Sequence, residues 1–357
     1  MKKIGREVYM LKTSAENARN GEGAFIRLKN GDIMYAYSRY TTGNSHDHGK
    51  AVIAAVFSGD EGETWGGHRD LFLNDDVNNM CVSLLRMDNG DIGIFYGCKY
   101  LKESTTVVMM NIYLRRSSDE GKTWSEPKKC INEEGYFVYE NDRVRRLESG
   151  RILLPLNLHA SYENGRIDNK GVFRLYYSDD DGYTWNTTGI GVNHPFEGSA
   201  GGLQETGLYQ YADGKVWAYS RTWSGNQYSC YSDDEGMNWT TPVVSEFFTS
   251  PPAPMNVKRI SDKYTVSIFN PTPNYTGREA HPRTWGRTPL ACAVSTDDAK
   301  TFKKIFAIED DPENGYCYAS VLAGEEYILV AYYHSNGERD PLKCCKITKI
   351  DLTEFEN

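Results

Sequence analysis

Apolar positions along the chain come in short runs separated by turns, and one arrangement of them recurs six times. Each copy has an apolar strand, a turn that usually contains glycine, and a second apolar strand. The copies span residues 25–33, 84–92, 144–152, 208–216, 257–266 and 321–328. Short apolar runs bounded by turn residues are typical of β-hairpins. The pattern therefore predicts an all-β fold, and no helical run competes with it.

A second motif, Ser-x-Asp-x-Gly-x-Thr-Trp, lies between the hairpins. Its five copies occupy residues 58–65, 117–124, 178–185, 232–239 and 295–302. The fourth copy has Asn238 in place of Thr, and the fifth has Ala299 and Phe302 in place of Gly and Trp. Ser and Asp side chains can bond nearby backbone N–H groups, glycine allows a positive φ, and Trp supplies an apolar anchor. We interpret the motif as a structural turn, so none of its aspartates is a catalytic candidate.

The spacing of this motif predicts the architecture. Its aspartates stand at positions 60, 119, 180, 234 and 297, in steps of 59, 61, 54 and 63 residues. Six hairpins and five motifs predict one domain over residues 1–357, a six-bladed β-propeller with four antiparallel strands in each blade. The last blade lacks the motif. We expect the N-terminal strand near residues 7–11 to close it beside residues 345–352, which leaves no free sheet edge.

The composition of the chain limits the classes of binding partner that can be expected. The net charge of −9 argues against a nucleic-acid or anionic-membrane surface. No apolar stretch reaches 18 residues, and no apolar region follows the basic N-terminus. We therefore expect no membrane span, no signal peptide and a cytoplasmic location, unless the sequence lacks its native start. The eight cysteines form no CxxC pair, which favours reduced thiols. The oligomeric state stays open.

Polar residues gather just before the first strand of each hairpin. In a propeller the innermost strands start near the central axis, so these residues should converge on one pocket. The set includes Arg19, Glu22, Asn78, Asn79, Asn141, Asp142, Arg143, Gln204, Glu205, Tyr316 and Tyr318. Several arginines aimed at one axis indicate an anionic ligand held by guanidinium groups. His46 and His48 have no third metal ligand at a suitable spacing, so neither a metal nor another cofactor is expected.

With its five repeat motifs, the Tyr-Ala-Ser sequence at 318–320 and this arginine pattern, the chain resembles the sialidase (neuraminidase) superfamily with its Asp-box, or BNR, repeats. The resemblance covers nearly the whole chain. It implies a retaining exo-glycosidase that hydrolyses terminal sialic acid, or a related acidic sugar, from glycoconjugates. The substrate would be a sialylated or other acidic glycan; the exact sugar and its linkage stay open.

The resemblance also implies the catalytic residues. Tyr318 looks like the nucleophile, Glu205 like the carboxylate that assists it, and Asp47 like the acid/base. A phenol has a pKa near 10, so a nearby carboxylate has to accept its proton as it attacks. A carboxylate nucleophile would be repelled by the carboxylate of the substrate, and sialidases use tyrosine instead.

Three arginines would bind the substrate carboxylate. Arg221 looks like the second and Arg287 like the third. The Arg-Ile-Pro sequence that usually carries the first arginine is absent; Arg19 matches best by its distance from the strand, and Arg27 is the weaker alternative. Paired N–H donors would hold the carboxylate and orient the sugar.

Other residues have two interpretations. Glu22 and Arg143 are expected at the same ligand, although Arg143 could instead form a structural ion pair with Asp142. Three aromatic residues in loops could stack on a sugar or simply pack: Trp223, Trp285 and Tyr275. Two rival functions also stay open. One is a propeller lyase or glycosidase acting on another acidic sugar, and the other is a non-catalytic carbohydrate-binding propeller.

Overall fold

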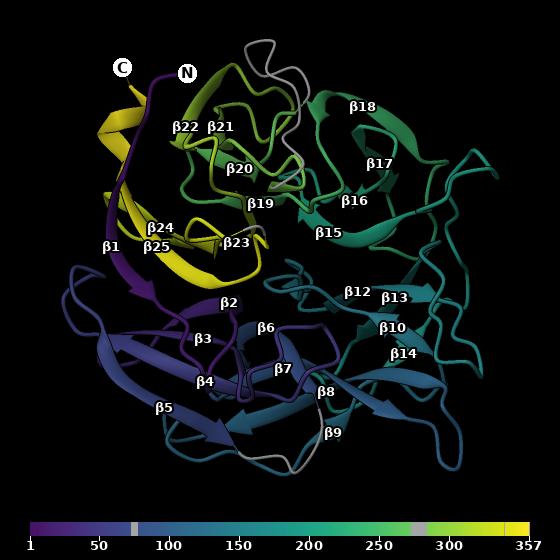
Figure 1. Ribbon diagram of the computed structural model, residues 1–357. Helices are drawn as coiled ribbons and strands as arrows, with labels where there is room; N and C mark the ends of the chain where they lie inside the picture. The colour runs from purple at the N-terminus through teal and green to yellow at the C-terminus, as the bar shows by residue number, and fades with distance from the viewer. Residues whose placement is uncertain (73–77, 273–283, 339, 357) are drawn as a thin grey trace.

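The computed structural model describes residues 1–357 except 73–77, 273–283, 339 and 357 (Figure 1). Its regular secondary structure is almost wholly β-strand, as predicted, and Figure 1 shows the sheets arranged around a common centre. A short 3-10 helix, η2 (Leu352–Phe355), follows the last strand. No described segment forms a helix long and apolar enough to cross a membrane.

The first half of the chain forms one sheet of 13 strands. Its strands are β2 (Asn20–Arg27), β3 (Ile33–Tyr40), β4 (Ala51–Ser58), β5 (Gly66–Phe72), β6 (Asn78–Arg86), β7 (Ile92–Leu101), β8 (Val108–Ser117), β9 (Lys128–Lys129), β10 (Tyr136–Val138), β11 (Arg145–Arg146), β12 (Ile152–His159), β13 (Val172–Ser178) and β14 (Asn186–Thr187). Its pairs are antiparallel except at two single-residue parallel contacts, Ala51 with Asn78 and Tyr136 with Met110. Those contacts divide the sheet into antiparallel groups that correspond to the predicted hairpins.

The second half, together with β1 from the start of the chain, forms three sheets of four antiparallel strands each. The first contains β15 (Gln204–Gln210), β16 (Val216–Arg221), β17 (Asn226–Ser232) and β18 (Val243–Thr249). The second contains β19 (Asn256–Arg259), β20 (Thr265–Phe269), β21 (Leu290–Ser295) and β22 (Lys304–Glu309). The third contains β23 (Tyr316–Ala323), β24 (Tyr327–His334), β25 (Cys344–Asp351) and β1 (Arg6–Leu11). In this last sheet β1 pairs with β25, with Leu11 opposite Cys345, so the first and last strands lie side by side.

The repeated motif forms a tight turn held by its own side chains. In the first copy Ser58 Oγ accepts the N–H of Gly62 at 2.9 Å, and Asp60 Oδ1 accepts the N–H of Thr64 at 2.8 Å. Gly62 has a φ of 82°, a conformation that disfavours other residues. Trp65 Nε1 donates to the carbonyl of Gly62 at 3.0 Å. These contacts are internal to the turn, which confirms its structural interpretation.

The first strands of most groups and sheets have an irregular backbone that directs side chains toward the centre. Four of these strands change register near their first residues, which marks a β-bulge. The residue at each bulge, and its counterpart before β11, has a positive φ although it is not glycine: Glu22 (52°), Cys81 (58°), Asp142 (54°), Glu205 (49°) and Tyr318 (58°). Such conformations persist only where the surrounding structure enforces them, and they gather at functional sites.

Apolar side chains fill the space between neighbouring sheets and, within the 13-stranded sheet, between its antiparallel groups. The repeat tryptophans take part; Trp185, for example, meets Phe95 edge to face with 5.9 Å between ring centroids. All eight cysteines are buried and unpaired, in agreement with the reduced thiols expected from sequence.

Candidate functional site

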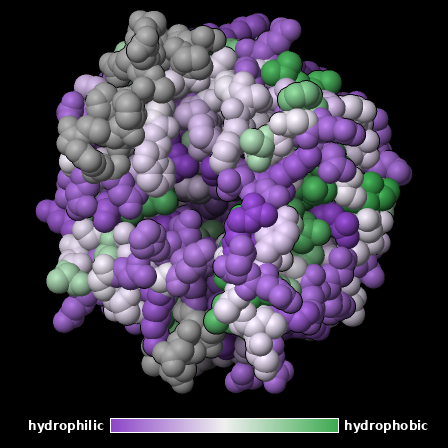
Figure 2. Space-filling model, turned by 45° about the vertical axis from the view of Figure 1, so that its right-hand side comes forward, coloured by the Kyte–Doolittle hydropathy of each residue, from purple (hydrophilic) through white to green (hydrophobic). Residues whose placement is uncertain are grey.

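A cavity of about 600 Å³ lies where the sheets converge. Figure 2 shows a hollow near the middle of this face with hydrophilic residues around it. The cavity is lined by seven of the eight residues predicted for catalysis or substrate binding: Arg19, Glu22, Asp47, Glu205, Arg221, Arg287 and Tyr318. They come from distant segments of the chain, and the outermost two, Arg19 and Tyr318, are 299 positions apart. The fold therefore brings together most of the predicted set.

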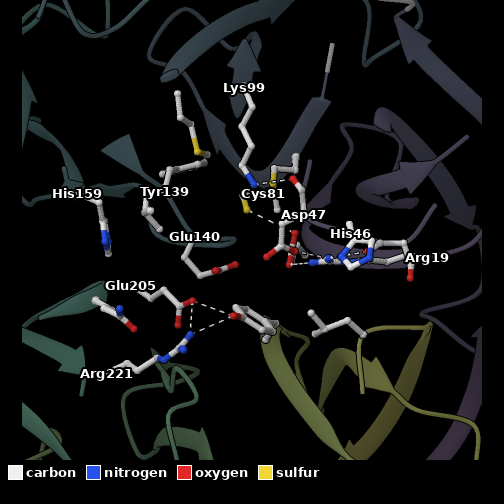
Figure 3. A pocket seen from close by; sticks show the side chains of 18 of the residues that line it. Arg19, His46, Asp47, Cys81, Lys99, Tyr139, Glu140, His159, Glu205 and Arg221 are labelled. Carbon is white, nitrogen blue, oxygen red and sulfur yellow. Dashed lines mark hydrogen bonds and ion pairs between the residues drawn. The ribbon is translucent and has the colours of Figure 1, made fainter. Parts of the chain in front are cut away.

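Tyr318, on β23, shares one carboxylate oxygen with Arg221. Its hydroxyl donates to Glu205 Oε1 at 2.8 Å, and Arg221 Nη1 donates to the same oxygen at 2.6 Å. Arg221 Nη1 also lies 3.3 Å from the hydroxyl oxygen of Tyr318 (Figure 3). Burial and the charge of Glu205 hold the pKa of Tyr318 well above its usual value, against the opposing charges of the nearby arginines. The phenol is therefore neutral and already bonded to a base that can accept its proton.

Arg287, in the segment before β21, lies over the ring of Tyr318 with its guanidinium carbon 5.2 Å from the ring centroid. It donates to the carbonyl of Pro252 at 2.9 Å and to Cys317 Sγ at 3.2 Å. Within the described part of the chain, the buried Nε atoms of Arg287 and Arg221 have no hydrogen-bond partner. Two guanidinium groups beside one tyrosine form a cationic side of the cavity suited to an anionic ligand.

Arg19, whose side chain is 1% exposed, is held by the protein on every nitrogen. Its Nε donates to the Tyr333 hydroxyl at 2.7 Å, Nη1 to Asp47 Oδ1 at 2.5 Å, and Nη2 to Glu22. Arg27 instead faces the outer surface, where it pairs with Glu61 at 2.8 Å. Of the two candidates for the first arginine, the fold brings Arg19 to the cavity. A substrate carboxylate would have to replace Asp47 or Glu22 to bind its guanidinium.

Asp47 lies at the cavity rim, in the loop between β3 and β4, with its side chain 59% exposed. Partial burial would raise the pKa of its carboxyl, but the charges of Arg19 and Lys99 outweigh that effect and hold the pKa well below the usual range. Lys99 Nζ also donates to the backbone carbonyl of Asp47 at 2.7 Å. Asp47 is therefore ionised in the free protein. To act as the acid that the sequence predicts, it would have to leave Arg19.

Arg143 is the one predicted catalytic or binding residue that does not line the cavity. Of the wider set expected near the axis, the cavity lining also lacks Asn78, Asn79, Asn141, Asp142 and Tyr316. Arg143 is buried, lies just before β11, and donates to the carbonyl of Met255, the residue before β19, at 2.8 Å. The alternative pairing with Asp142 is not formed either, because Asp142 bonds Lys258 at 3.0 Å and Arg145 at 3.3 Å. Arg143 is thus placed to support the strand ends rather than to contact a ligand in this cavity.

Several cavity residues escaped the sequence analysis: Cys81, Lys99, Tyr139, Glu140 and His159. Glu140 directly precedes the predicted Asn141, and its pKa is held well above the usual value by burial and by the charges of Glu22 and Glu205. A signal for Glu140 existed, since it is a carboxylate in the polar run before the third hairpin. Cys81 offered none, because buried cysteines are common in any core.

One group of possible metal ligands occurs among the described residues. Ligand atoms of Glu22, Cys81 and Glu140 all lie within 4.8 Å of one another. Glu22 is already bound by Arg19, and burial together with nearby carboxylates raises the pKa of the Cys81 thiol well above its usual value. A metal needs deprotonated ligands, so this arrangement is poorly prepared for one.

The three aromatic loop candidates differ in position. Trp285 lines the cavity, with the guanidinium carbon of Arg287 5.1 Å from its ring centroid. Trp223 is 46% exposed and donates to Gln204 Oε1 at 3.3 Å, outside the cavity lining. Tyr275 lies outside the described residues. Of the two described candidates, Trp285 is therefore the one available to a ligand in the cavity.

Comparison with solved structures supports a common fold at low sequence identity. A protein of unknown function from Dyadobacter fermentans matches at 20% identity and a TM-score of 0.75, over 97% of this chain and 99% of that one. The intramolecular trans-sialidase from Ruminococcus gnavus, in complex with oseltamivir carboxylate, matches at 14% and 0.74, over 99% and 98%. The NanB sialidase from Streptococcus pneumoniae matches at 14% and 0.72, over 98% and 71%.

A family comparison gives the assignment. The family described as "BNR repeat-like domain" matches residues 73–330, which is more than half of the chain. The match spans four of the five repeat motifs identified in the sequence. The chain therefore belongs to the BNR repeat-like family.

Proposed function

We propose that this protein is a retaining exo-glycosidase that removes a terminal sialic acid, or a related acidic sugar, from a glycan. The observation that carries the proposal is the contact of Tyr318 and Arg221 with one oxygen of Glu205, beneath the guanidinium of Arg287. The sialidase and trans-sialidase among the similar structures support it. As scaffold we propose a six-bladed propeller, closed by the sheet that contains β1 and β25.

The chemistry follows from the charges at the cavity. Arg221 and Arg287 bind the carboxylate of the sugar and bring its anomeric carbon to Tyr318. As the phenol oxygen forms its bond to that carbon, its proton passes to Glu205, and the bond to the leaving oxygen breaks. Asp47, at the rim, donates a proton to the leaving oxygen and later removes one from the attacking water. Two displacements at one carbon give retention.

The proposed reaction also gives a role to the ion pair between Arg19 and Asp47. Asp47 has to be protonated to act as an acid, yet Arg19 keeps it ionised in the free protein. A substrate carboxylate that binds Arg19 would release Asp47 and let its pKa rise. Substrate binding would then prepare the acid, so the ion pair is part of the proposed cycle.

The test is release of fluorophore from a fluorogenic sialoside by the wild type, Tyr318→Phe and Asp47→Ala. We expect release by the wild type, almost none by Tyr318→Phe, and a smaller loss for Asp47→Ala because an activated leaving group needs little acid catalysis. NMR of the first-formed sugar anomer checks retention. Binding of sialic acid without release would instead favour a carbohydrate-binding propeller, and an unsaturated uronate product would favour a lyase.

A further inference from the structure

The cavity has two chemically different sides. The side formed by the three four-stranded sheets contributes Glu205, Arg221, Arg287 and Tyr318. The side formed by the 13-stranded sheet and its connections contributes Glu22, Cys81, Lys99 and Glu140. The proposed mechanism uses the first side, together with Arg19 and Asp47, for the carboxylate, the anomeric carbon and the leaving oxygen. The rest of the second side then faces other substituents of the sugar ring.

On that second side, Glu140 is the carboxyl group with an oxygen left for a ligand. It lies in the segment between β10 and β11, is 4% exposed, and lines the cavity. Its Oε1 accepts the backbone N–H of Asn141 at 2.7 Å, and among the described residues no hydrogen bond forms to Oε2. Figure 3 shows its carboxyl group projecting between Arg19 and Asp47 on one side and Glu205 and Arg221 on the other.

The groups around Glu140 keep it neutral. The carboxylate of Glu22 and the thiol of Cys81 have ligand atoms within 4.8 Å of its own, and no cation pairs with Glu140 among the described residues. Arg19 and Cys81 donate to Glu22, and Arg19 opposes the effect of burial, which raises the pKa of Glu22. Two carboxyl groups this close repel each other when both are charged. In agreement, burial, Glu22 and Glu205 raise the pKa of Glu140. A neutral carboxyl group can both donate and accept one hydrogen bond.

We propose that Glu140, backed by Glu22, makes this site select acidic sugars that present a hydroxyl group, rather than an acetamido group, to the second side of the cavity. The inference rests on the proposed function. A hydroxyl can accept from the Glu140 O–H and donate to Glu22, which satisfies all three groups. An acetamido group also carries a donor and an acceptor, but it is larger and would place a methyl group against two buried carboxyl groups, at a cost that a site built for a hydroxyl exploits.

The experiment compares two fluorogenic nonulosonic acid glycosides with the same aglycone, one with an acetamido group and one with a hydroxyl group at the same ring carbon. We expect kcat/KM at least roughly tenfold higher for the hydroxyl substrate. Equal values, or a preference for the acetamido substrate seated on the apolar residues Met80, Met110 and Val138, would overturn the assignment.

Variants of Glu140 test whether this residue causes the preference for the hydroxyl substrate. Glu140→Leu removes the hydrogen bond and should abolish the preference, mainly through KM, whereas Glu140→Gln keeps a donor and an acceptor and should retain part of it. Glu148→Gln, on the exposed turn between β11 and β12, is the matched control and should behave as wild type. A preference unchanged in Glu140→Leu would overturn the proposal even if that variant is otherwise impaired.

Two further measurements separate the possible failures. If neither glycoside is cleaved, the proposed function fails, and ligand-observed NMR of the two free sugars still reports which one binds. Tighter binding of the hydroxyl sugar would then uphold the selectivity, and its absence would overturn it. Loss of the preference with EDTA, restored by Zn²⁺, would also overturn it, because a metal held by Glu22, Cys81 and Glu140 would then select the hydroxyl.

Discussion

Tyr318 and Glu205 lie 113 positions apart in the sequence, yet the hydroxyl of one donates to the carboxylate of the other at 2.8 Å. Each stands at a bulge in the first strand of its sheet, with a φ of 58° and 49° respectively. A positive φ disfavours side chains of this size, so the surrounding sheets hold both residues in place. The proposed nucleophile therefore meets its base before any substrate arrives.

The phenol oxygen of Tyr318 should be indispensable to the proposed reaction. Tyr318→Phe removes the nucleophile while the ring keeps its edge-to-face contact with Tyr333. We expect kcat on a fluorogenic sialoside to fall by at least roughly 10³-fold, with a melting temperature close to that of the wild type. Tyr231→Phe, on strand β17, is the control and should keep full activity. Unchanged release by Tyr318→Phe would remove this residue from the role of nucleophile.

The planar fork of Arg287 should matter beyond its charge. Arg287→Lys keeps the positive charge but loses the paired N–H donors that fit a carboxylate. We expect KM for an acidic sugar glycoside to rise by roughly tenfold or more, with a smaller change in kcat. Steady-state kinetics measures both constants. Arg166→Lys, in the exposed segment before β13, should leave KM unchanged; an equal KM for Arg287→Lys would contradict carboxylate binding by Arg287.

The sequence was sufficient for the strand pattern and for seven of the eight predicted catalytic and binding residues, because spacing is a local signal and several first strands start near the centre. The prediction was wrong for the segment from Glu140 to Arg143, where Arg143 was expected at the cavity and Glu140 was not considered. Strict alternation would send Glu140 and Asp142 to the same face, but Asp142 has a φ of 54° and bonds Lys258 instead of lining the cavity. The irregular backbone therefore brings Glu140 into the cavity and leaves Arg143 outside it.

The partners of Arg19 could not be predicted from the sequence either. Its distance from the first strand was enough to place it at the cavity, as expected. Glu22 is close in sequence, but Asp47 and Tyr333 reach it from other segments. No local pattern predicts that three side chains will occupy one guanidinium. The pairing, and with it the ionised state of Asp47, emerges only from the assembled sheets.

The repeat turns should stabilise the fold through their serine. Ser117 Oγ is buried, accepts the N–H of Gly121 at 2.7 Å, and donates to Asp119 at 2.8 Å. Ser117→Ala leaves that buried N–H unpaired, which should lower the free energy of unfolding by about 1–3 kcal/mol. Urea denaturation measures the difference. Ser118→Ala, at the exposed next position, should match the wild type; equal losses in both variants would contradict a specific contribution from the turn.

Asp142 should make stability depend on pH in the acid range. Burial would raise the pKa of its carboxyl, but Lys258 and Arg145 lower it from 3.8 to about 2. A folded-state pKa below the unfolded one stabilises the protein above pH 3.8, and this contribution is lost as the pH falls through about 2. The shift corresponds to about 2 kcal/mol.

The variant Asp142→Asn tests this contribution directly. At pH 7 it leaves Lys258 and Arg145 without their anion, so we expect it to be less stable than the wild type by about 3–5 kcal/mol. Between pH 4 and pH 2 only the wild type loses the contribution of Asp142, so the difference in unfolding free energy should shrink by about 2 kcal/mol. Asp213→Asn, at an exposed turn, should follow the wild type across this range. A difference that stays constant with pH would mean that the charge of Asp142 does not stabilise the strand ends beneath the cavity.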